Sequence, residues 1–314
     1  MKIIVLCGGT SPEREVSLNS GKAVGDALRE FGHDAEVVDI TSICEFLSDR
    51  KNYKADGVFI ALHGGWGEDG RLQAALEAFE IPFTGSGSAA CMLAMDKSAA
   101  KLAFADAGVP VPEGFTATKK NNNIDRAEAL LKKTGKIIVK PNGGGSTVGV
   151  TPLTDIDDYM HALELSWQYE EKALVEEFID GEEITVPLAE NAHNQTFTLP
   201  AIHIKPKVGF YDYKNKYTHG NTEYICPADL PDEITGRLSK LAILAHNSLG
   251  CRVYNRIDFR LSRDNKLYAL ESNTAPGMTS TSLVPKAAKA YGYTFGGFLD
   301  EIIRTSFAID RWKK

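Results

Sequence analysis

Short apolar runs alternate with segments of helical periodicity through roughly the first hundred residues of the chain. KIIVLC, DAEVVDI and GVFIALHG have the length and composition of buried strands, and residues 18–32 and 71–80 have helical spacing. This alternation predicts parallel β-α-β units. Because ligands of parallel sheets bind at the carboxyl ends of the strands, GGTSPEREVS and LHGGWGEDG, which follow two of these strands, are candidate site segments.

Composition narrows the class of protein. The 314 residues allow two or three domains, and a net charge of −7 offers no basic surface for nucleic acid or an anionic membrane. The five cysteines are scattered without a CxxC pair, which favours a reducing compartment and argues against a zinc site. The apolar run at the start is too short for a signal peptide, and no run has the length of a membrane helix. We therefore expect a cytoplasmic protein.

Two strands near the C-terminal end, RIDFRL and KLYALESN, are separated by a turn at residues 264–265. If that turn has two residues, Asp258 lies opposite Glu271 and Arg256 lies opposite Asn273. Alternation then gives this hairpin one polar face and one apolar face. The expected apolar pairs are Leu261 with Tyr268 and Phe259 with Leu270.

The two opposed carboxylates on the polar face need a reason, because like charges directly opposite each other destabilise a sheet. Two carboxylates and an amide oxygen are the hard donors that Mg²⁺ prefers, usually together with substrate phosphates. The alternative is a solvated sheet face on which both acids point into water. A phosphate-binding feature elsewhere in the chain would favour the metal.

The segment VKPNGGGSTVG at residues 139–149 is such a feature. It matches neither the P-loop nor the GxGxxG nor the GxSxG pattern. It does place a glycine turn between two strands with Lys140 at its base, where unhindered backbone N–H groups can approach phosphate oxygens. The alternative is an ordinary flexible hairpin with an incidental lysine.

Taken together, these parts resemble the ATP-grasp enzymes and, in detail, the D-alanine–D-alanine ligases. The motifs occur in the family's order along nearly the whole chain. They are GGTSPEREVSLNSG, LHGGWGEDGRLQ, PFTGSG, MDK, VKPNGGGSTVG, FYDYKNKY, RID and LESNTAPGMTSTSLVP. The resemblance implies a mixed α/β and α+β fold of three domains with a parallel sheet in the first. We place the domains at residues 1–95, 96–182 and 183–314, the first binding the first substrate.

The resemblance also implies an ATP site between the central and C-terminal domains. Lys97, Lys140 and Lys216 match the lysines of the phosphates and the substrate loop. The residues matched to ATP binding are Lys97, Lys140, Glu176, Glu177, Phe178, Ile179, Glu183, Phe210 and Lys216. Asp258, Glu271 and Asn273 match the ligands of two Mg²⁺ ions, for which Mn²⁺ is an alternative.

The implied reaction joins two D-alanine molecules through a D-alanyl phosphate, with release of ADP and phosphate, for peptidoglycan precursor synthesis. Arg256 and the Gly277 N–H match the stabilisers of the oxyanion, and Lys216 acts from its loop. Glu15, with His63 nearby, matches the binder of the first ammonium. Ser146 and Tyr217 match a pair that closes the site, and Ser282 and Leu283 match the binders of the second carboxylate. Relatives are commonly homodimers.

Several assignments have structural alternatives. Glu15 could pair with Arg14 or Lys22 on the surface, and His63 could be a hydrogen-bonded, half-buried histidine. Tyr217 could be a packing aromatic, and Lys216 could be one more solvated charge. The sequence does not show where Trp66 of the HGGWGEDG motif points.

Two functional alternatives stay open as well. One is a ligase that makes D-alanyl-D-lactate; Tyr217, where that branch usually has histidine, favours an amine nucleophile, although His219 lies two residues further on. The other is a catalytically silent ATP-binding protein. The lysines, the metal-type ligands and Glu15 argue against it.

Overall fold

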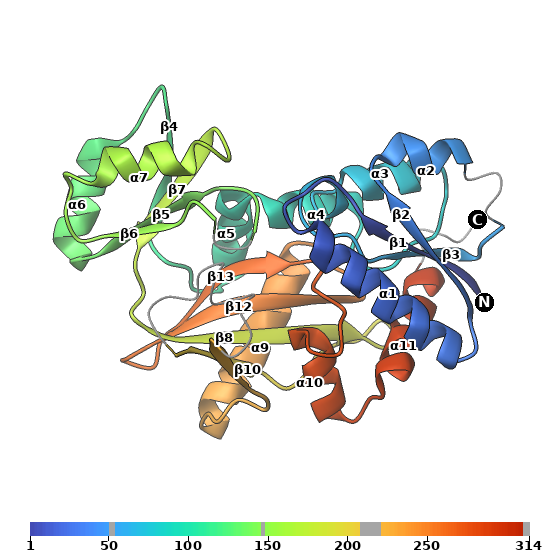
Figure 1. Cartoon of the computed structure of the whole chain (residues 1–314). Helices are drawn as coiled ribbons and strands as arrows, with labels where there is room; N and C mark the ends of the chain where they lie inside the picture. Colours follow the sequence, from blue (N-terminus) through green and yellow to red (C-terminus); the bar gives the residue numbers. More distant parts are fainter. Residues whose placement is uncertain (50–53, 146–147, 208–220, 310–314) are drawn as a thin grey trace.

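The computed structural model describes residues 1–49, 54–145, 148–207 and 221–309. Within these residues the chain forms three sheets with helices packed against them (Figure 1). The predicted mixed α/β fold with an N-terminal parallel sheet is confirmed. Among the described residues, no helix combines the length and the apolar character needed to cross a bilayer.

The N-terminal sheet is parallel. Its elements are β1 (Lys2–Gly8), α1 (Arg14–Glu30), β2 (Asp34–Ile40), α2 (Ile43–Asp49), β3 (Gly57–Ile60), η2 (Gly65–Gly67) and α3 (Arg71–Ala78), with strand order β2-β1-β3. Successive side chains of β1 point to opposite faces, so Ile3 and Val5 pack toward α1 while Ile4 and Leu6 pack toward α2 and α3. Both faces are therefore buried, as the unbroken apolar run of β1 predicts.

Residues 88–108 have helical spacing throughout, but in the structure they form two helices. They are α4 (Ser88–Met95) and α5 (Lys97–Asp106). The break falls at Asp96, whose side chain caps α5 by accepting a hydrogen bond from the Ala99 N–H at 2.9 Å. Burial opposes the charged carboxylate, but hydrogen bonds from Asn142, Ala99 and Ser98 outweigh it and lower the pKa of Asp96 to about 2. The break places Lys97 in the first turn of α5.

The central sheet is antiparallel, with strand order β4-β7-β5-β6. Its elements are β4 (Gly114–Thr118), α6 (Ile124–Thr134), β5 (Ile137–Pro141), β6 (Thr151–Leu153), α7 (Tyr159–Ser166) and β7 (Lys172–Glu177). Side chains from both helices and all four strands form a core of their own. Of the described residues 148–153, Thr151–Leu153 form the strand β6, and within residues 156–171 the helix α7 spans Tyr159–Ser166.

The C-terminal sheet is antiparallel and runs β11-β10-β8-β12-β13, with β9 paired to β8. Its elements are β8 (Gly181–Glu190), β9 (Thr196–Thr198), β10 (Ile202–Pro206), β11 (Thr222–Ile225), α9 (Asp232–Ser248), β12 (Tyr254–Ser262) and β13 (Leu267–Asn273). The chain continues into α10 (Leu283–Tyr291) and α11 (Phe295–Ala308). The sequence does not predict β11, because most of its residues belong to the polar segment 209–224, which reads as a loop.

The β12–β13 hairpin corrects the sequence-based register in part. Its turn has three residues, with Asn265 at φ 59° and Ser262 paired to Lys266 by hydrogen bonds. In the part of the hairpin next to the turn, the register is therefore offset by one residue from the prediction, so that Leu261 lies opposite Leu267. The other near pairs are Phe259 with Ala269 and Arg260 with Tyr268. The predicted Leu261–Tyr268 and Phe259–Leu270 pairs are wrong.

A β-bulge then restores the predicted register beyond Asp258. The register shifts between Asp258 and Phe259, so that Asp258 lies opposite Glu271 and Arg256 lies opposite Asn273, as predicted. The bulge leaves Leu270 without a partner, and Leu270 lines the same pocket as Glu271. The apolar face of β13 consists instead of Leu267 and Ala269.

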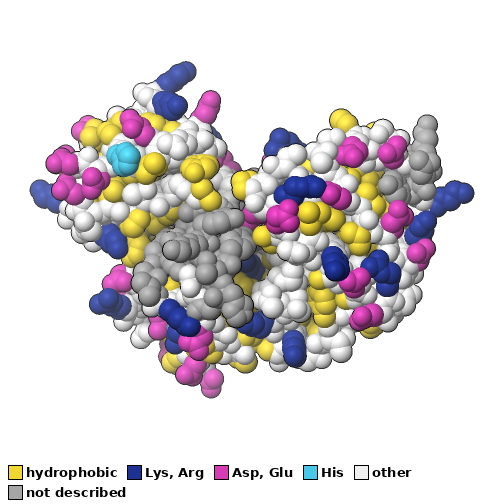
Figure 2. Space-filling view, viewed as in Figure 1, with side chains coloured by type: hydrophobic (Ala, Val, Ile, Leu, Met, Phe, Trp, Pro, Cys, Tyr) yellow, Lys and Arg dark blue, Asp and Glu magenta, His cyan; other side chains and the backbone are white. Residues whose placement is uncertain are grey.

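The surface of the molecule is divided by a notch. Figure 2 shows it between the lobe that carries α6 and α7 and the lobe that carries α2 and α3. Side chains of both charge signs are interspersed on this face, as the modest net charge of −7 leads one to expect.

Candidate active site

One pocket gathers the described nucleotide residues expected from the sequence and two of the three expected metal residues, Asp258 and Glu271, while Asn273 does not line it. It lies where the central and C-terminal sheets face each other, and it encloses about 860 Å³ measured to its open mouth. Its lining includes Lys97, Lys140, Glu176, Glu177, Phe178, Ile179, Glu183, Asp258 and Glu271. Gly143, Gly144, Gly145, Val148, Val150, Pro112, Ile138, Pro141, Arg260 and Leu270 complete it.

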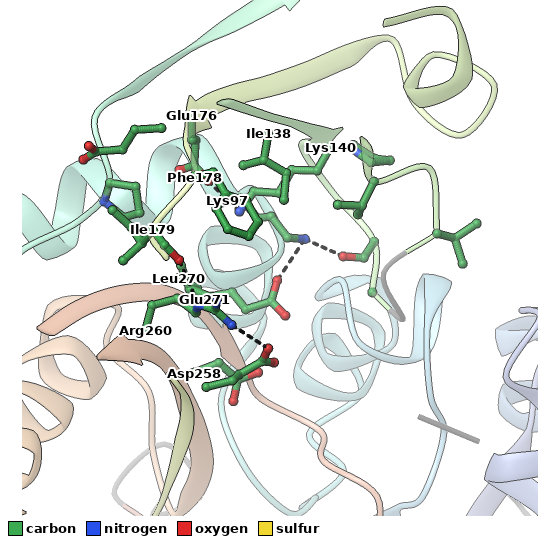
Figure 3. Close-up of a pocket in the computed structure, with 18 of the residues that line it drawn as sticks. Lys97, Ile138, Lys140, Glu176, Phe178, Ile179, Asp258, Arg260, Leu270 and Glu271 are labelled. Atoms are coloured by element: carbon green, nitrogen blue, oxygen red, sulfur yellow. Dashed lines mark hydrogen bonds and ion pairs between the residues drawn. The ribbon is translucent and has the colours of Figure 1, made fainter. Parts of the chain in front are cut away.

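Lys97 connects three elements at this pocket. Its ammonium donates to the Gly144 carbonyl at 2.5 Å and lies 3.3 Å from the Glu271 carboxylate (Figure 3). A cation from α5 thus joins the glycine loop to the acidic strand β13. An anion entering here would meet a buried ammonium beside glycine backbone, which is the setting that favours phosphate.

The base of the glycine loop is fixed to the same helix. Asn142 is buried, its Oδ1 accepts from the Ser98 N–H at 3.0 Å, and its amide donates to Asp96 at 2.8 Å. The Lys97 N–H in turn donates to the Asn142 carbonyl at 3.0 Å. The loop therefore begins from a rigid anchor on α5.

Glu176 sits between two lysines. Lys140 of β5 lies 2.6 Å from one carboxylate oxygen and Lys101 of α5 lies 2.5 Å from the other. Burial alone would raise the pKa of Glu176, but the two ammonium groups outweigh it and lower the pKa. The carboxylate is therefore ionised although the side chain is only 1% exposed.

The opposed acids of β12 and β13 are each held against a cation. Arg256 donates to both oxygens of Asp258 at 3.0 Å, and Thr185 donates to Asp258 at 2.5 Å. Glu271 faces Lys97, and the Asn273 side-chain oxygen accepts from the Ala275 N–H at 3.1 Å. In the described part of the chain no three His, Cys, Asp or Glu side chains form a metal-type cluster. The expected set instead combines two carboxylates with an amide oxygen, a donor set that suits Mg²⁺.

Three contributors to this site were missed in the sequence. Arg260 donates to the Ile179 carbonyl at 3.1 Å and lies 3.3 Å from Glu183, so it supports two expected nucleotide contacts. It continues the even-numbered polar positions of β12, and that alternation could have revealed it. Thr185 and Lys101 gave no such signal, because their roles depend on pairing between distant strands and helices.

His63 lies in a second group of residues near the first sheet. Its Nδ1 donates to the Ala275 carbonyl at 3.1 Å, and its Nε2 accepts from Ser20 at 2.9 Å. Ser20 also accepts from the Met278 N–H at 3.4 Å, which ties the segment containing Gly277 to α1. Burial lowers the pKa of His63, so it is neutral at pH 7. These contacts fit the buried, hydrogen-bonded alternative, and contact with substrate stays a prediction.

Glu68 of the HGGWGEDG motif is the most perturbed acid of this group and was missed in the sequence. Burial, and next the neighbouring charge of Glu13, raise its pKa to about 8. Its carboxylate lies 4.0 Å from His63 Nδ1. Trp66 of the same motif points toward the loop after β1, where its N–H donates to Thr10 at 3.2 Å.

The other expected substrate residues are placed as follows. Glu15 is exposed in the first turn of α1, and among the described residues no ion pair joins it to Arg14 or Lys22. Arg14 pairs instead with Asp39 at 2.6 Å. Ser282 directly precedes α10, which begins at Leu283. The Ser282 hydroxyl accepts a hydrogen bond from the Thr279 N–H at 3.1 Å and lies close to the Cα of Gly277. Ser146, Phe210, Lys216 and Tyr217 lie outside the described residues.

A glycine hairpin and two antiparallel sheets that enclose a pocket of lysines and acids form the ATP-grasp fold. Comparison with models of protein families identifies the family within this fold. The model described as "D-ala D-ala ligase C-terminus" matches residues 103–304, and that described as "D-ala D-ala ligase N-terminus" matches residues 44–86. The chain belongs to the D-alanine–D-alanine ligase family, which confirms the resemblance found in the sequence.

Individual relatives resemble this chain in sequence and structure over almost its full length. The D-alanine–D-alanine ligase of Desulforamulus reducens is 42% identical over 309 residues, which cover 97% of this chain and 98% of the relative. The crystal structure of D-alanine–D-alanine ligase from Bacillus anthracis complexed with ATP matches with a TM-score of 0.82 at 31% identity, covering 98% of this chain and 96% of that one. VanG D-Ala:D-Ser ligase from Enterococcus faecalis matches with a TM-score of 0.82 at 29% identity, covering 96% and 98%.

Proposed function

We propose that this chain ligates two D-alanine molecules to D-alanyl-D-alanine while ATP is converted to ADP and phosphate. The observation that carries the proposal is the pocket, in which Lys97, Lys140 and the glycine loop face the opposed acids Asp258 and Glu271. Support comes from relatives that are named for this ligation and from the ATP complex of a similar structure.

The chemistry requires an activated carboxylate. A carboxylate oxygen of the first D-alanine attacks the γ-phosphorus of ATP, the bond to ADP breaks, and a D-alanyl phosphate forms. The amine of the second D-alanine then attacks the carbonyl carbon, phosphate leaves, and the amine loses a proton. Positioning and neutralisation of charge dominate catalysis of the phosphoryl step. Lys97 and Lys140, which line the pocket, would supply both for the phosphates.

The acids fit a role in holding two Mg²⁺ or Mn²⁺ ions. Asp258, Glu271 and Asn273 would be the ligands, and the bound ions would neutralise charge developing on the phosphates. Asp258 and Glu271 each form an ion pair with a cation in the structure, Arg256 and Lys97 respectively. Arg256 and Lys97 are then available to turn toward substrate oxygens.

The substrate residues follow the family pattern. Glu15 would bind the first ammonium, and Ser282 with the Leu283 N–H would bind the second carboxylate. Arg256 and the Gly277 N–H would stabilise the oxyanion, a donor of this kind being worth about 2.7–4 kcal/mol. His63 would hold the Gly277 segment in place through Ala275 and Ser20. Ser146, Tyr217 and Lys216 would close the site and exclude water from the acyl phosphate.

The identity of the second substrate is the main choice left by the fold, because a D-Ala:D-Ser ligase has the same architecture. The test is a reaction of the chain with ATP, Mg²⁺ and D-alanine alone, and with D-lactate or D-serine added. We expect D-alanine-dependent phosphate release and D-alanyl-D-alanine as the product. ADP without dipeptide contradicts the proposal. ATP binding without any phosphate release would indicate the silent ATP-binding alternative.

The proposed product would enter peptidoglycan precursor synthesis in the cytoplasm, where ATP is available. We also propose that the chain forms a homodimer, as relatives commonly do. Light scattering on the purified chain checks the assembly, and a mass of one chain, 34.2 kDa, contradicts it.

A further inference from the structure

Lys101 is a buried cation that takes no part in the chemistry proposed above. It lies one helical turn after Lys97 on α5, so both side chains leave the same face of the helix. Its side chain is 7% exposed and does not line the pocket, in contrast to Lys97 and Lys140. A buried ammonium of this kind is unfavourable unless an anion compensates it.

The compensating anion is Glu176, which Lys101 shares with Lys140. Lys101 Nζ lies 2.5 Å from Glu176 Oε1, and Lys140 Nζ lies 2.6 Å from Oε2. Among the described residues Oε1 accepts no hydrogen bond of good geometry, so its contact with Lys101 is chiefly an ion pair. The Lys101 ammonium also lies 3.5 Å from the Ala269 carbonyl of β13.

The two lysines differ in what they can reach. Lys140 lines the pocket from β5, beside the glycine loop (Figure 3), whereas Lys101 reaches Glu176 from α5 without lining the pocket. A triphosphate in the pocket would attract Lys140 away from Glu176. Glu176 would then be a buried carboxylate, and only a second cation that stays in place would keep it compensated.

We propose that Lys101 is a positioning residue that neutralises Glu176 from behind, so that Lys140 can leave Glu176 and bind the phosphates of the nucleotide. The inference rests on the proposed ATP-dependent function and adds to it a device for exchanging ion-pair partners. Without Lys101, Lys140 is the sole counter-charge of Glu176 among the described residues, and nucleotide binding has to break a buried pair.

The test measures nucleotide binding without ligation. A non-hydrolysable ATP analogue with Mg²⁺ and no D-alanine is titrated by calorimetry into the parent, Lys101→Met, Glu176→Gln and the double variant. We expect Lys101→Met to weaken binding about tenfold or more, because Lys140 stays on Glu176. The double variant should recover most of this loss, because the neutral glutamine side chain no longer retains Lys140. In steady-state assays the KM for ATP should rise much more than kcat falls.

A matched control removes another Lys–Glu pair. Lys133 pairs with Glu113 on the surface, both side chains being more than half exposed, and neither residue lines the pocket. Lys133→Met should leave nucleotide affinity unchanged. Unchanged affinity in Lys101→Met, or a double variant as weak as the summed single effects, would overturn the inference. A parent that binds no nucleotide would instead contradict the proposed function.

The pH dependence of the parent gives a readout that needs no variant. Burial, opposed by Glu176, lowers the pKa of Lys101 to about 8. The charged groups facing Lys101 are Glu176 of β7, Lys140 of β5 and Glu271 of β13. Affinity for the analogue should fall as pH rises through about 8, since neutral Lys101 no longer compensates Glu176. Affinity that stays constant from pH 7 to pH 9 would contradict the inference, and Lys101→Met should be weak and flat across that range.

Discussion

At the scale of single residues, three carboxylates of the pocket are each held by a cation from a different element. Glu271 of β13 faces Lys97 of α5, Glu183 of β8 faces Arg260 of β12, and Glu176 of β7 faces Lys101 and Lys140. These ion pairs offset the cost of burying the carboxylates in part. A polyanion that binds with its metal ions would therefore have to replace some of these existing ion pairs with new ones.

Glu271→Gln tests the metal assignment. The substitution keeps the size of the side chain but removes the anionic oxygen opposite Asp258. We expect D-alanine-dependent phosphate release to fall about 100-fold or more, since even groups that only support metal ligands are worth 10–100-fold. The melting temperature should change little. Glu128→Gln on the exposed face of α6 is the control, and near-parental activity of Glu271→Gln would remove this residue from the metal site.

Glu68 makes stability depend on pH. Its pKa is about 8 in the folded chain and near 4.5 in the unfolded one, so the folded state binds one proton more between these values. The free energy of unfolding therefore falls as pH rises from 5 to 8, by on the order of 3 kcal/mol from this group. Glu68→Gln should lack this contribution. Its free energy of unfolding should therefore fall less than that of the parent between pH 5 and pH 8.

Denaturant unfolding without nucleotide or Mg²⁺, at pH 5 and pH 8, checks this prediction. Glu128→Gln should follow the parent at both values. Parallel pH profiles of the parent and Glu68→Gln would show that Glu68 ionises in the folded chain near its ordinary pKa.

The residues that sequence analysis could identify are those with a local pattern. Lys140 beside glycines and Asp258 and Glu271 on alternating positions belong to this group. Lys101, Glu68 and Thr185 do not, since each matters through a partner at least 50 residues away or through burial that only the tertiary structure creates. Their chemistry could not be predicted from spacing.

At the scale of elements, the β12–β13 hairpin shows a correct prediction reached through two compensating errors. The prediction assumes a two-residue turn, whereas the turn has three residues with Asn265 in the left-handed region. The bulge at Leu270 returns the register by one residue, so Asp258 still faces Glu271. Period-2 alternation cannot reveal a bulge, because a bulge breaks that period locally.

The start of β8 gives an element-scale prediction. Gly181 has φ 152°, and a Cβ there would lie 2.0 Å from the Leu261 carbonyl oxygen of β12. The backbone cannot yield without separating the strands that carry Glu183 and Arg260. Gly181→Ala should therefore lower the free energy of unfolding by about 3 kcal/mol. Thermal and denaturant unfolding measure it.

Gly236 in α9 is the matched control, because no atom of the described residues lies within 4 Å of a Cβ at that position. Gly236→Ala should stabilise the chain by about 0.5–1 kcal/mol, since alanine restricts the unfolded chain and favours helix. Equal effects of the two substitutions would contradict the steric argument at Gly181.

At the scale of the whole molecule, the end of the chain completes the core of its beginning. Phe298 and Ile302 of α11 pack with Ile3 of β1 and Val24 of α1, and the same core includes Tyr254 of β12. His33, after α1, also lies 3.0 Å from Asp300 of α11. The central sheet, by contrast, has a core whose described members all lie between residues 115 and 175. Long-range packing of this kind is invisible in a pattern of local elements.

This division predicts which parts of the molecule lose stability together. Phe298 is 1% exposed, and Phe298→Ala should cost about 3–5 kcal/mol. Because its core joins the first and third sheets, amide hydrogen exchange should become faster in both β1 and β12. Exchange in β5 and β7 should stay close to the parent, since their core shares no residue with that of Phe298.

Leu163→Ala is the complementary substitution, because Leu163 is fully buried in the core of the central sheet. It should accelerate exchange in β5 and β7 and spare β1. If either variant accelerated exchange uniformly, the molecule would be one cooperative unit. If the two variants give distinct patterns of exchange, the central sheet can move relative to the rest of the chain. Such a movement would open and close the pocket between the sheets around a nucleotide. Adding the ATP analogue with Mg²⁺ should then slow exchange on both sides of the pocket at once.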